Sequence, residues 1–142
     1  MLTINKIFPQ EKIPEKTESF LFFDIETTGF SRDNTILYLI GCGYFAEEGF
    51  QFIQWFNDDG TSEEEILLAF QNILVKKDWQ LVTFNGNSFD IPYLKRHYDL
   101  NELTCDIEKY PSLDFTSFKT FSKSFSDDTW KTKRLGTVSW LK

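Results

Sequence analysis

The chain has few of the residues that form metal sites with nitrogen and sulfur ligands. Its 142 residues include two cysteines and one histidine, and Cys42 and Cys105 lie far apart, with no Cys-x-x-Cys spacing. A zinc site or a disulfide framework needs more such residues at closer spacing. Isolated thiols fit a reducing compartment, which predicts a cytoplasmic protein with two unreactive cysteines. The one histidine, His97, is expected to be a packed or surface residue rather than a catalytic one.

Long apolar runs are also missing. No run approaches the ~20 residues of a membrane-spanning helix. The first 16 residues lack the basic start and apolar segment of a signal peptide. The sequence therefore predicts neither a membrane partner nor export.

The chain has no overall excess of basic residues. Its formal net charge of −7 argues mildly against nucleic-acid binding by bulk electrostatics. The charge is uneven, however, because residues 119–142 carry six basic and two acidic side chains, whereas residues 1–118 carry nine basic and 20 acidic ones. This asymmetry is typical of ordinary solvated surface, and also of a phosphate-facing edge beside an acidic centre.

What the sequence does contain is a distinctive stretch at residues 20–29, FLFFDIETTG. An unbroken apolar run bounded by a glycine predicts a strand that is buried on both faces. Because side chains alternate along a strand, Asp24 and Glu26 point to the same side at its exit. Two carboxylates held this close require a shared proton or a bound cation. Oxygen ligands favour a hard cation such as Mg²⁺ or Mn²⁺.

The Asp-x-Glu pair is a weak signal without its context. Chance gives roughly 0.8 matches in a chain of this composition, and residues 106–108 repeat the triplet DIE without an apolar strand before it. We interpret that second copy as a solvated loop. After the first copy, Thr27, Thr28 and Gly29 predict a turn whose backbone N–H groups suit a phosphate or a terminal nucleotide. The alternative is a plain strand that ends in a polar turn.

The rest of the pattern predicts one mixed α/β domain. Residues 1–19 are polar and contain two prolines, so they are expected to be an extended lead-in to a domain that spans residues 20–142. A capping box, with Ser62 as N-cap and Glu65 three residues later, marks the start of a helix. Strand, helix and strand in succession imply a parallel pair with a right-handed crossover. The predicted strands lie at residues 20–26, 36–45, 50–56, 79–84 and 111–118.

A second acidic position follows the strand at residues 79–84. The next residues read NGNSFDIP, in which Asn-Gly predicts a turn and Ser88 a helix N-cap. Asp90 then lies in the first helical turn, at the same edge of the sheet as Asp24, where open α/β sheets place their ligands. Complementing the helix dipole would by itself explain an aspartate at this position.

Together, FFDIETTG and FNGNSFDIPYL resemble the two first motifs of the ribonuclease H-like 3′–5′ exonucleases of the DEDD superfamily. Within these, the chain is most similar to the YprB-type predicted bacterial exonucleases, over about residues 20–142. The resemblance implies a ribonuclease H-like α/β fold, with antiparallel strands followed by parallel ones and flanking helices. It implies that Asp24, Glu26 and Asp90 bind two divalent metal ions, Mg²⁺ or Mn²⁺.

The resemblance also implies which residues meet the substrate. In the family, the first motif contacts the 3′-terminal nucleotide and the second motif shapes the neighbouring loop. The corresponding residues here are Thr27, Thr28, Gly29 and Phe30, the last as a stacking surface, together with Asn85 and Phe89 of the second loop.

The chain departs from the family in its third motif. That motif carries a fourth acidic residue and a histidine or tyrosine, and it should lie beyond Lys142. Asp127 and Asp128 come too early to replace it. The chain is therefore expected to be a fragment of a longer protein with additional domains, or a natural remnant that lacks full activity.

The sequence supports three hypotheses about function. The first is a metal-dependent nuclease, a 3′–5′ exonuclease acting on single-stranded DNA or RNA. The second is an aspartyl-phosphate phosphatase, since FFDIETTG superficially resembles Asp-x-Asp-x-Thr with Glu26 in place of the second aspartate. The third is a nucleic-acid-binding module of the same fold that has lost the chemistry.

Overall fold

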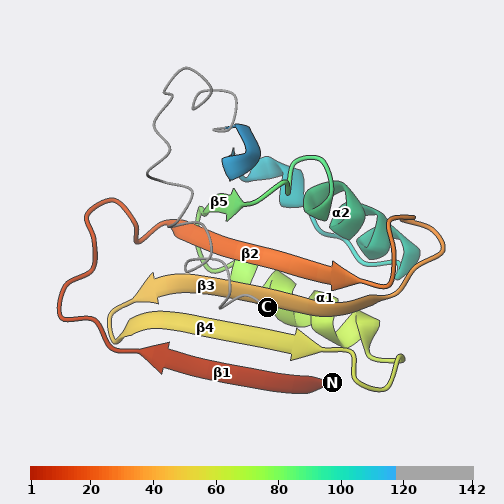
Figure 1. Cartoon of the computed structure of the whole chain (residues 1–142), viewed down its shortest axis with the longest axis horizontal. Helices are drawn as coiled ribbons and strands as arrows, with labels where there is room; N and C mark the ends of the chain where they lie inside the picture. The colour runs from red at the N-terminus through yellow and green to blue at the C-terminus, as the bar shows by residue number, and fades with distance from the viewer. Residues whose placement is uncertain (118–142) are drawn as a thin grey trace, which may run out of the picture.

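The central strand, β2 (Phe20–Thr27), joins two differently built halves of one sheet. The computed structural model describes residues 1–117, whose six strands follow the order β1-β4-β3-β2-β5-β6. On one side of β2, the strands β3 (Leu37–Ala46) and β4 (Gly49–Phe56) form an antiparallel hairpin. On the other side, β5 (Gln80–Thr83) runs parallel to β2 (Figure 1). The last strand, β6 (Ser112–Asp114), pairs in parallel with β5. The predicted mixed α/β sheet is confirmed.

The outer antiparallel strand, β1 (Leu2–Phe8), corrects the sequence-based expectation for the N-terminus. The sequence pattern predicts only an extended lead-in over residues 1–19, whereas Leu2–Phe8 pairs along its whole length with β4. It is an edge strand with little buried surface. Apolar and polar residues alternate only from Leu2 to Asn5, and Lys6 breaks the alternation, so the pattern is too short to stand out as a half-buried strand.

The helix predicted between β4 and β5 is α1 (Glu63–Leu74), but the two strands that it connects do not form the predicted parallel pair. The strands β3 and β2 lie between them, and β5 pairs in parallel with β2. Three glutamates in its first turn complement the helix dipole. The predicted capping box is wrong, because Ser62 occupies the N-cap position without a side-chain cap bond. Its hydroxyl instead donates to the carboxylate of Asp59 at 2.8 Å. The buried face of α1 consists of Ile66, Leu67, Phe70, Ile73 and Leu74.

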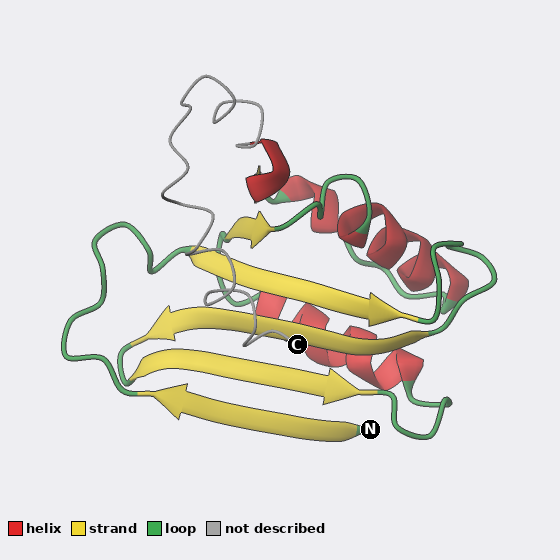
Figure 2. Ribbon diagram, in the orientation of Figure 1, coloured by secondary structure: helices red, strands yellow, loops and turns green. Residues whose placement is uncertain are grey.

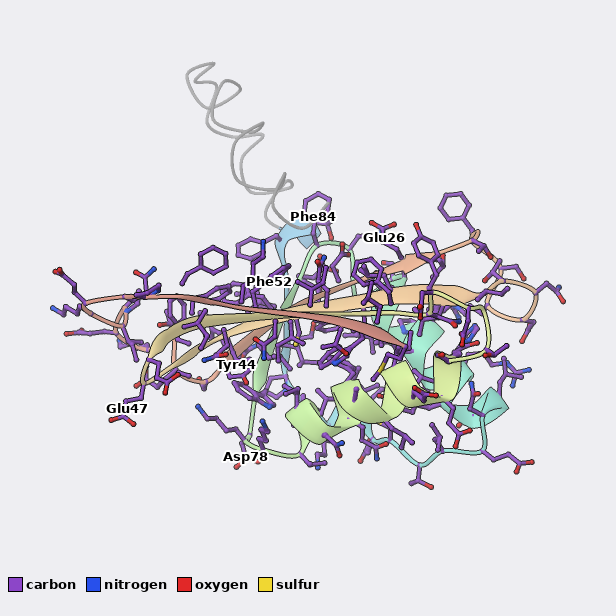
Figure 3. All side chains as sticks on the ribbon, turned by 90° about the horizontal axis from the view of Figure 1, so that it is seen from below. Glu26, Tyr44, Glu47, Phe52, Asp78 and Phe84 are labelled. Carbon is purple, nitrogen blue, oxygen red and sulfur yellow. The ribbon has the colours of Figure 1, made fainter. Side chains whose placement is uncertain are left out.

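Both helices that the structure describes, α1 and α2 (Asp90–Leu100), lie on the same side of the sheet (Figure 3). The prediction that β2 is buried on both faces is therefore wrong: its side chains alternate between buried and partly exposed. Figure 3 places Glu26 and Phe52 on the side opposite the helices. The β2 residues that face the helices and enter the core are Leu21, Phe23 and Ile25.

Two short 3₁₀ helices flank β6, namely Ile107–Lys109 and Phe115–Ser117 (Figure 2). The interpretation of the second DIE triplet as a solvated loop is only partly right. Asp106, at the N-cap of the first 3₁₀ helix, and Glu108 are exposed, but Ile107 is buried in the core. The basic segment at residues 119–142 and the helical pieces expected there lie outside the described residues. No helix within residues 1–117 has both the length and the apolar character to cross a membrane.

Candidate active site

The two acidic motifs meet where β5 ends beside β2. The parallel pairing of these strands stops at Phe22 and Val82, while β2 continues to Thr27. Beyond that point, the first residue of α2 lies beside β2. Its side chain, the carboxyl group of Asp90, is hydrogen-bonded to the backbone of Ile25. That carboxyl group is also hydrogen-bonded to the side chain of Asp24. The juxtaposition of Asp24 and Asp90 expected from the sequence is therefore present.

This carboxyl pair shares a proton in the metal-free protein. Asp90 is 4% exposed, and burial raises its pKa to about 8, with further contributions from the charge and hydrogen bond of Asp24. The protonated Asp90 therefore donates to the carboxylate of Asp24 near neutral pH. The Oδ2 atom of Asp90 is buried and has no hydrogen-bond partner in the described part of the chain. A buried carboxyl oxygen without a partner is costly and marks a position where a ligand atom would be stabilised.

Glu26 lies two residues beyond Asp24, on the same side of β2. The register pairs Asp24 with Gly41 and Glu26 with Leu39, and it shifts between Glu26 and Thr27. Irregularities of this kind bend a strand and change the direction of the side chains beside them. Within residues 1–117, no group of three or more acidic, histidine or cysteine side chains is arranged to hold a metal ion. Glu26, Asp24 and Asp90 therefore do not form a complete set of metal ligands.

The residues that are present nevertheless fit a hard divalent cation. Asp24 and Asp90 bring two carboxyl groups into contact, and one buried oxygen has no partner. A cation with oxygen ligands would take the place of the shared proton and satisfy that oxygen. The donor set therefore suits Mg²⁺ or Mn²⁺, with Glu26 as the further carboxylate on the same face of β2.

Asp114 supports the second motif and was not identified as a site residue from the sequence. It is 5% exposed at the end of β6, where its Oδ1 accepts the N–H of Asn85 at 2.8 Å and its Oδ2 accepts the N–H of Asn87 at 3.1 Å. Burial acts to raise its pKa, but hydrogen bonds from the hydroxyl and backbone of Thr116 and from the two asparagine amides lower it overall. Its carboxylate therefore stays charged and holds the turn before Asp90 in place.

The turn predicted at Asn85 and Gly86 is present, but the cap of the helix that follows differs from the prediction. Asn85 adopts a left-handed backbone conformation with φ of 65°. Gly86 packs directly on Thr83, so a Cβ atom there would collide with the threonine side chain. The helix cap predicted at Ser88 is wrong, because Phe89 occupies the N-cap position and makes no side-chain cap bond. Carbonyl groups of the turn accept the N–H groups of the first helical turn instead.

The predicted nucleotide-contacting turn uses most of its polar groups internally. The hydroxyl of Thr27 donates to the carbonyl of Gly29 at 2.6 Å. Thr28 donates its N–H to the carbonyl of Ile36, and its hydroxyl accepts the N–H of the same residue. The N–H of Thr28, which the sequence pattern assigns to a phosphate, is therefore already engaged.

The aromatic side chains beside this turn are arranged as a projecting pair. Phe30 is 93% exposed, and its ring meets that of Phe89 edge to face at 6.2 Å between centroids. The Phe89 ring packs in turn on Tyr93 of α2, at 5.5 Å. One fully exposed ring thus stands on a partly buried one, next to the acidic pair.

The chain has a mixed sheet and a carboxyl pair at the carboxyl end of two adjacent parallel strands. One acid comes from the central strand and the other from the start of a helix. These features are those of an α/β protein of ribonuclease H-like architecture. The sequence comparison agrees: residues 21–135 match the RNase_H_2 model, which is described as RNase_H superfamily. The chain therefore belongs to the RNase H superfamily. No curated protein matches it in sequence.

Solved structures of similar fold include three of exonuclease I. The structure of E. coli exonuclease I in complex with a dT13 oligonucleotide superposes with a TM-score of 0.62 at 8% identity, covering 77% of this chain and 30% of that one. The ExoI/SSB-Ct complex gives 0.60 and apo exonuclease I gives 0.61, each at 10% identity, with 77% and 31% of the two chains covered. The chain thus spans less than a third of these proteins, and the likeness at such low identity establishes the fold.

Proposed function

We propose that this chain is the catalytic portion, or part of it, of a metal-dependent nuclease, a DEDD-type 3′–5′ exonuclease that acts on single-stranded DNA or RNA. The observation that carries the proposal is the contact between the carboxyl groups of Asp24 and Asp90, with an unpartnered buried oxygen on Asp90. Membership of the RNase H superfamily supports it. The likeness in fold to exonuclease I, one structure of which contains an oligonucleotide, is consistent with it.

The chain's own residues would contribute position and charge. Asp24, Glu26 and Asp90 would hold the divalent ions, which supply a Lewis acid for the phosphoryl group and lower the pKa of an attacking water. Phe30, supported by Phe89, would stack on a base of the strand. Asp114 would keep the loop before α2 in the geometry that positions Asp90.

Calorimetric titration with Mn²⁺ tests the metal site directly. The chain is expected to bind Mn²⁺ saturably, and Asp24→Asn and Asp90→Asn are each expected to abolish that binding. The matched control is Asp106→Asn, which changes the first residue of the second DIE triplet, an exposed aspartate at the N-cap of the first 3₁₀ helix. If all three variants bind like the unmodified chain, the assignment of the site is wrong.

Cleavage of a labelled single-stranded oligonucleotide in Mn²⁺ tests the activity, and should be run on the chain and on the longest natural protein that contains it. Loss of cleavage in Asp24→Asn, with retention in Asp106→Asn, is the expected result. Binding that depends on salt but is indifferent to Mn²⁺, without cleavage by either protein, would favour the binding-module alternative. The phosphatase alternative gains no support from the superfamily match. Failure of beryllium fluoride to form a stable complex with the protein would exclude this alternative.

A further inference from the structure

The one histidine of the chain is buried at a junction of three segments. His97 is 2% exposed on α2. Its Nδ1 contacts the carboxylate of Glu63 in the first turn of α1, and its Nε2 lies 2.8 Å from the carbonyl oxygen of Arg32. Arg32 belongs to residues 28–36, the loop that follows the first acidic motif and is called here the 28–36 loop.

The partners of His97 define its protonation state. A carboxylate and a backbone carbonyl are both acceptors only, so each ring nitrogen must carry a proton for both contacts to be hydrogen bonds. The imidazolium form is therefore the one that satisfies this arrangement, and a neutral ring would lose one of the two bonds. The Tyr93 ring stacks on the imidazole at 4.1 Å and 11°. Burial raises the pKa of Tyr93, so that this neighbour stays uncharged.

The same helix face holds the 28–36 loop at further points. The Tyr93 hydroxyl is hydrogen-bonded to that of Thr35 at 2.9 Å, and Arg96 is paired with Asp33 at 2.6 Å. The Arg32 side chain reaches the carbonyl of Ser88 at 3.5 Å. Among these contacts, the one between Arg96 and Asp33 is solvent-exposed and weak, whereas the His97 contacts are part-buried and are made by a ring that is itself buried.

The loop that His97 holds carries the exposed ring of Phe30. Phe30 lies at the start of the loop and rests on Phe89, one residue before α2 begins. Helix α2 thus presents Asp90 at its first residue and fixes the 28–36 loop through His97 about two turns later. A single helix, α2, therefore positions both Asp90 and the loop that carries Phe30.

We propose that His97 is a positioning residue: in its doubly protonated form it bridges Glu63 and the Arg32 carbonyl and fixes the 28–36 loop, with Phe30, in the geometry that receives a single strand. The role of the loop in strand binding rests on the proposed function, whereas the bridge itself does not. The charged or titratable groups that the structure places against the ring are Glu63 from α1, Tyr93 from α2 and Arg32 from the loop.

Nuclear magnetic resonance on the full chain tests the bridge without any substrate. Because the chain has a single histidine, selective ¹⁵N-histidine labelling reports on His97 alone. Both ring N–H signals are expected at low pH. As the pH is raised, the loss of one ring N–H signal should be accompanied by shifts of the 28–36 backbone amides with the same midpoint. Loop amides that do not follow the imidazole would overturn the proposal.

Glu63→Gln separates charge from structure. The glutamine amide can donate to Nδ1, so a neutral His97 keeps both contacts, and the loop amides should become insensitive to pH while remaining in the native position. His97→Ala should give the loop spectrum of the high-pH form at every pH. If the Glu63→Gln loop titrates like the unmodified chain, the bridge does not control the loop.

The strand-binding role is measured by fluorescence anisotropy with a fluorescein-labelled, phosphorothioate-linked oligothymidylate in Mn²⁺ buffer. Affinity is expected to fall about tenfold in His97→Ala, as for the loss of a buried charged hydrogen bond. Affinity should also fall with rising pH, and more steeply in the unmodified chain than in Glu63→Gln. Because Asp90 is present in both proteins, its effect on the pH dependence cancels in this comparison. Equal affinities in all three proteins would overturn the positioning role. A chain that binds no oligonucleotide, but whose loop still follows His97, would refute the proposed function and leave the bridge established.

Discussion

The carboxyl pair makes a quantitative prediction about how the stability of the metal-free protein depends on pH. The pKa of Asp90 is raised from 3.8 to about 8 by burial and by Asp24. Between these values the folded chain retains a proton that the unfolded chain has lost. Stability therefore falls as the pH rises through this window, by about 1.4 kcal/mol for each pH unit, and the contribution levels off above about pH 8.

Asp90→Asn removes this dependence and otherwise preserves the contacts. The amide can donate to the Asp24 carboxylate as the protonated acid does, and it carries no charge to be neutralised. The variant and the unmodified chain are expected to be similarly stable near pH 4. From pH 5 to pH 7 the advantage of the variant should grow by roughly 2–3 kcal/mol. Because Asp90 is almost fully buried, solvent screening reduces this figure little.

Urea unfolding followed by tryptophan fluorescence, in EDTA and at several pH values, measures the effect. The quantity to compare is the difference in unfolding free energy between the two proteins, because titrations elsewhere in the chain cancel in it. Asp106→Asn, at an exposed position of the same triplet type, should follow the unmodified chain at all pH values. A constant difference between Asp90→Asn and the unmodified chain would refute the shared proton.

Three further expectations follow from the surroundings of the site. Asp114→Ala leaves part-buried backbone N–H groups of the turn without their acceptor and should lower the unfolding free energy by about 1–3 kcal/mol in urea titrations. Gly86→Ala should cost about 1–3 kcal/mol by the same measure, because its methyl group meets the side chain of Thr83, and Thr83→Ala in the same chain should restore part of the loss. Burial raises the pKa of Cys42 to about 12, so a thiol reagent at about pH 8 should modify the half-buried Cys105 in the native protein and Cys42 only on unfolding.

The elements that the sequence predicts correctly are those whose signal is local. The β2–β3–β4 meander, α1 and β5 each have an apolar pattern of their own, and turn signals predict the start of α2. The order of strand, helix and strand predicts that β5 runs parallel to β4, but it does not predict that β5 pairs with β2 instead of β4. The pattern does not reveal β1, because Leu2–Phe8 acquires its structure from pairing with the distant β4 and buries little surface. The caps at Ser62 and Ser88 fail for a related reason: competing partners, such as the Asp59 carboxylate, lie in loops whose shape the pattern does not specify.

The same limit applies to the candidate site. The meeting of Asp24 and Asp90 could be predicted because each follows its own strand to a common edge. The contacts of Asp114 with the turn before α2 could not be predicted, because they join residues that are separated by 27 or 29 positions in the sequence. The presence of this aspartate on a short strand adjacent to β5 was the only available signal. The sequence leaves open whether His97 is packed or on the surface, and its bridge between α1 and the 28–36 loop requires the packed tertiary structure.

The chain order of the sheet has a consequence for the kinetics of folding. Asp24 lies on the antiparallel meander, whose strands are neighbours in sequence, whereas Asp90 reaches it only after the α1 crossover has closed and the parallel strand has docked. Contacts between neighbouring segments close with less loss of chain entropy and tend to form first. The cost of placing Asp90 beside Asp24, which includes the proton that Asp90 retains in the folded chain, is therefore expected to arise late in folding, where it speeds unfolding more than it slows folding. A sequence arranged in this way can carry a costly carboxyl pair at its functional centre with little effect on the rate of its own assembly.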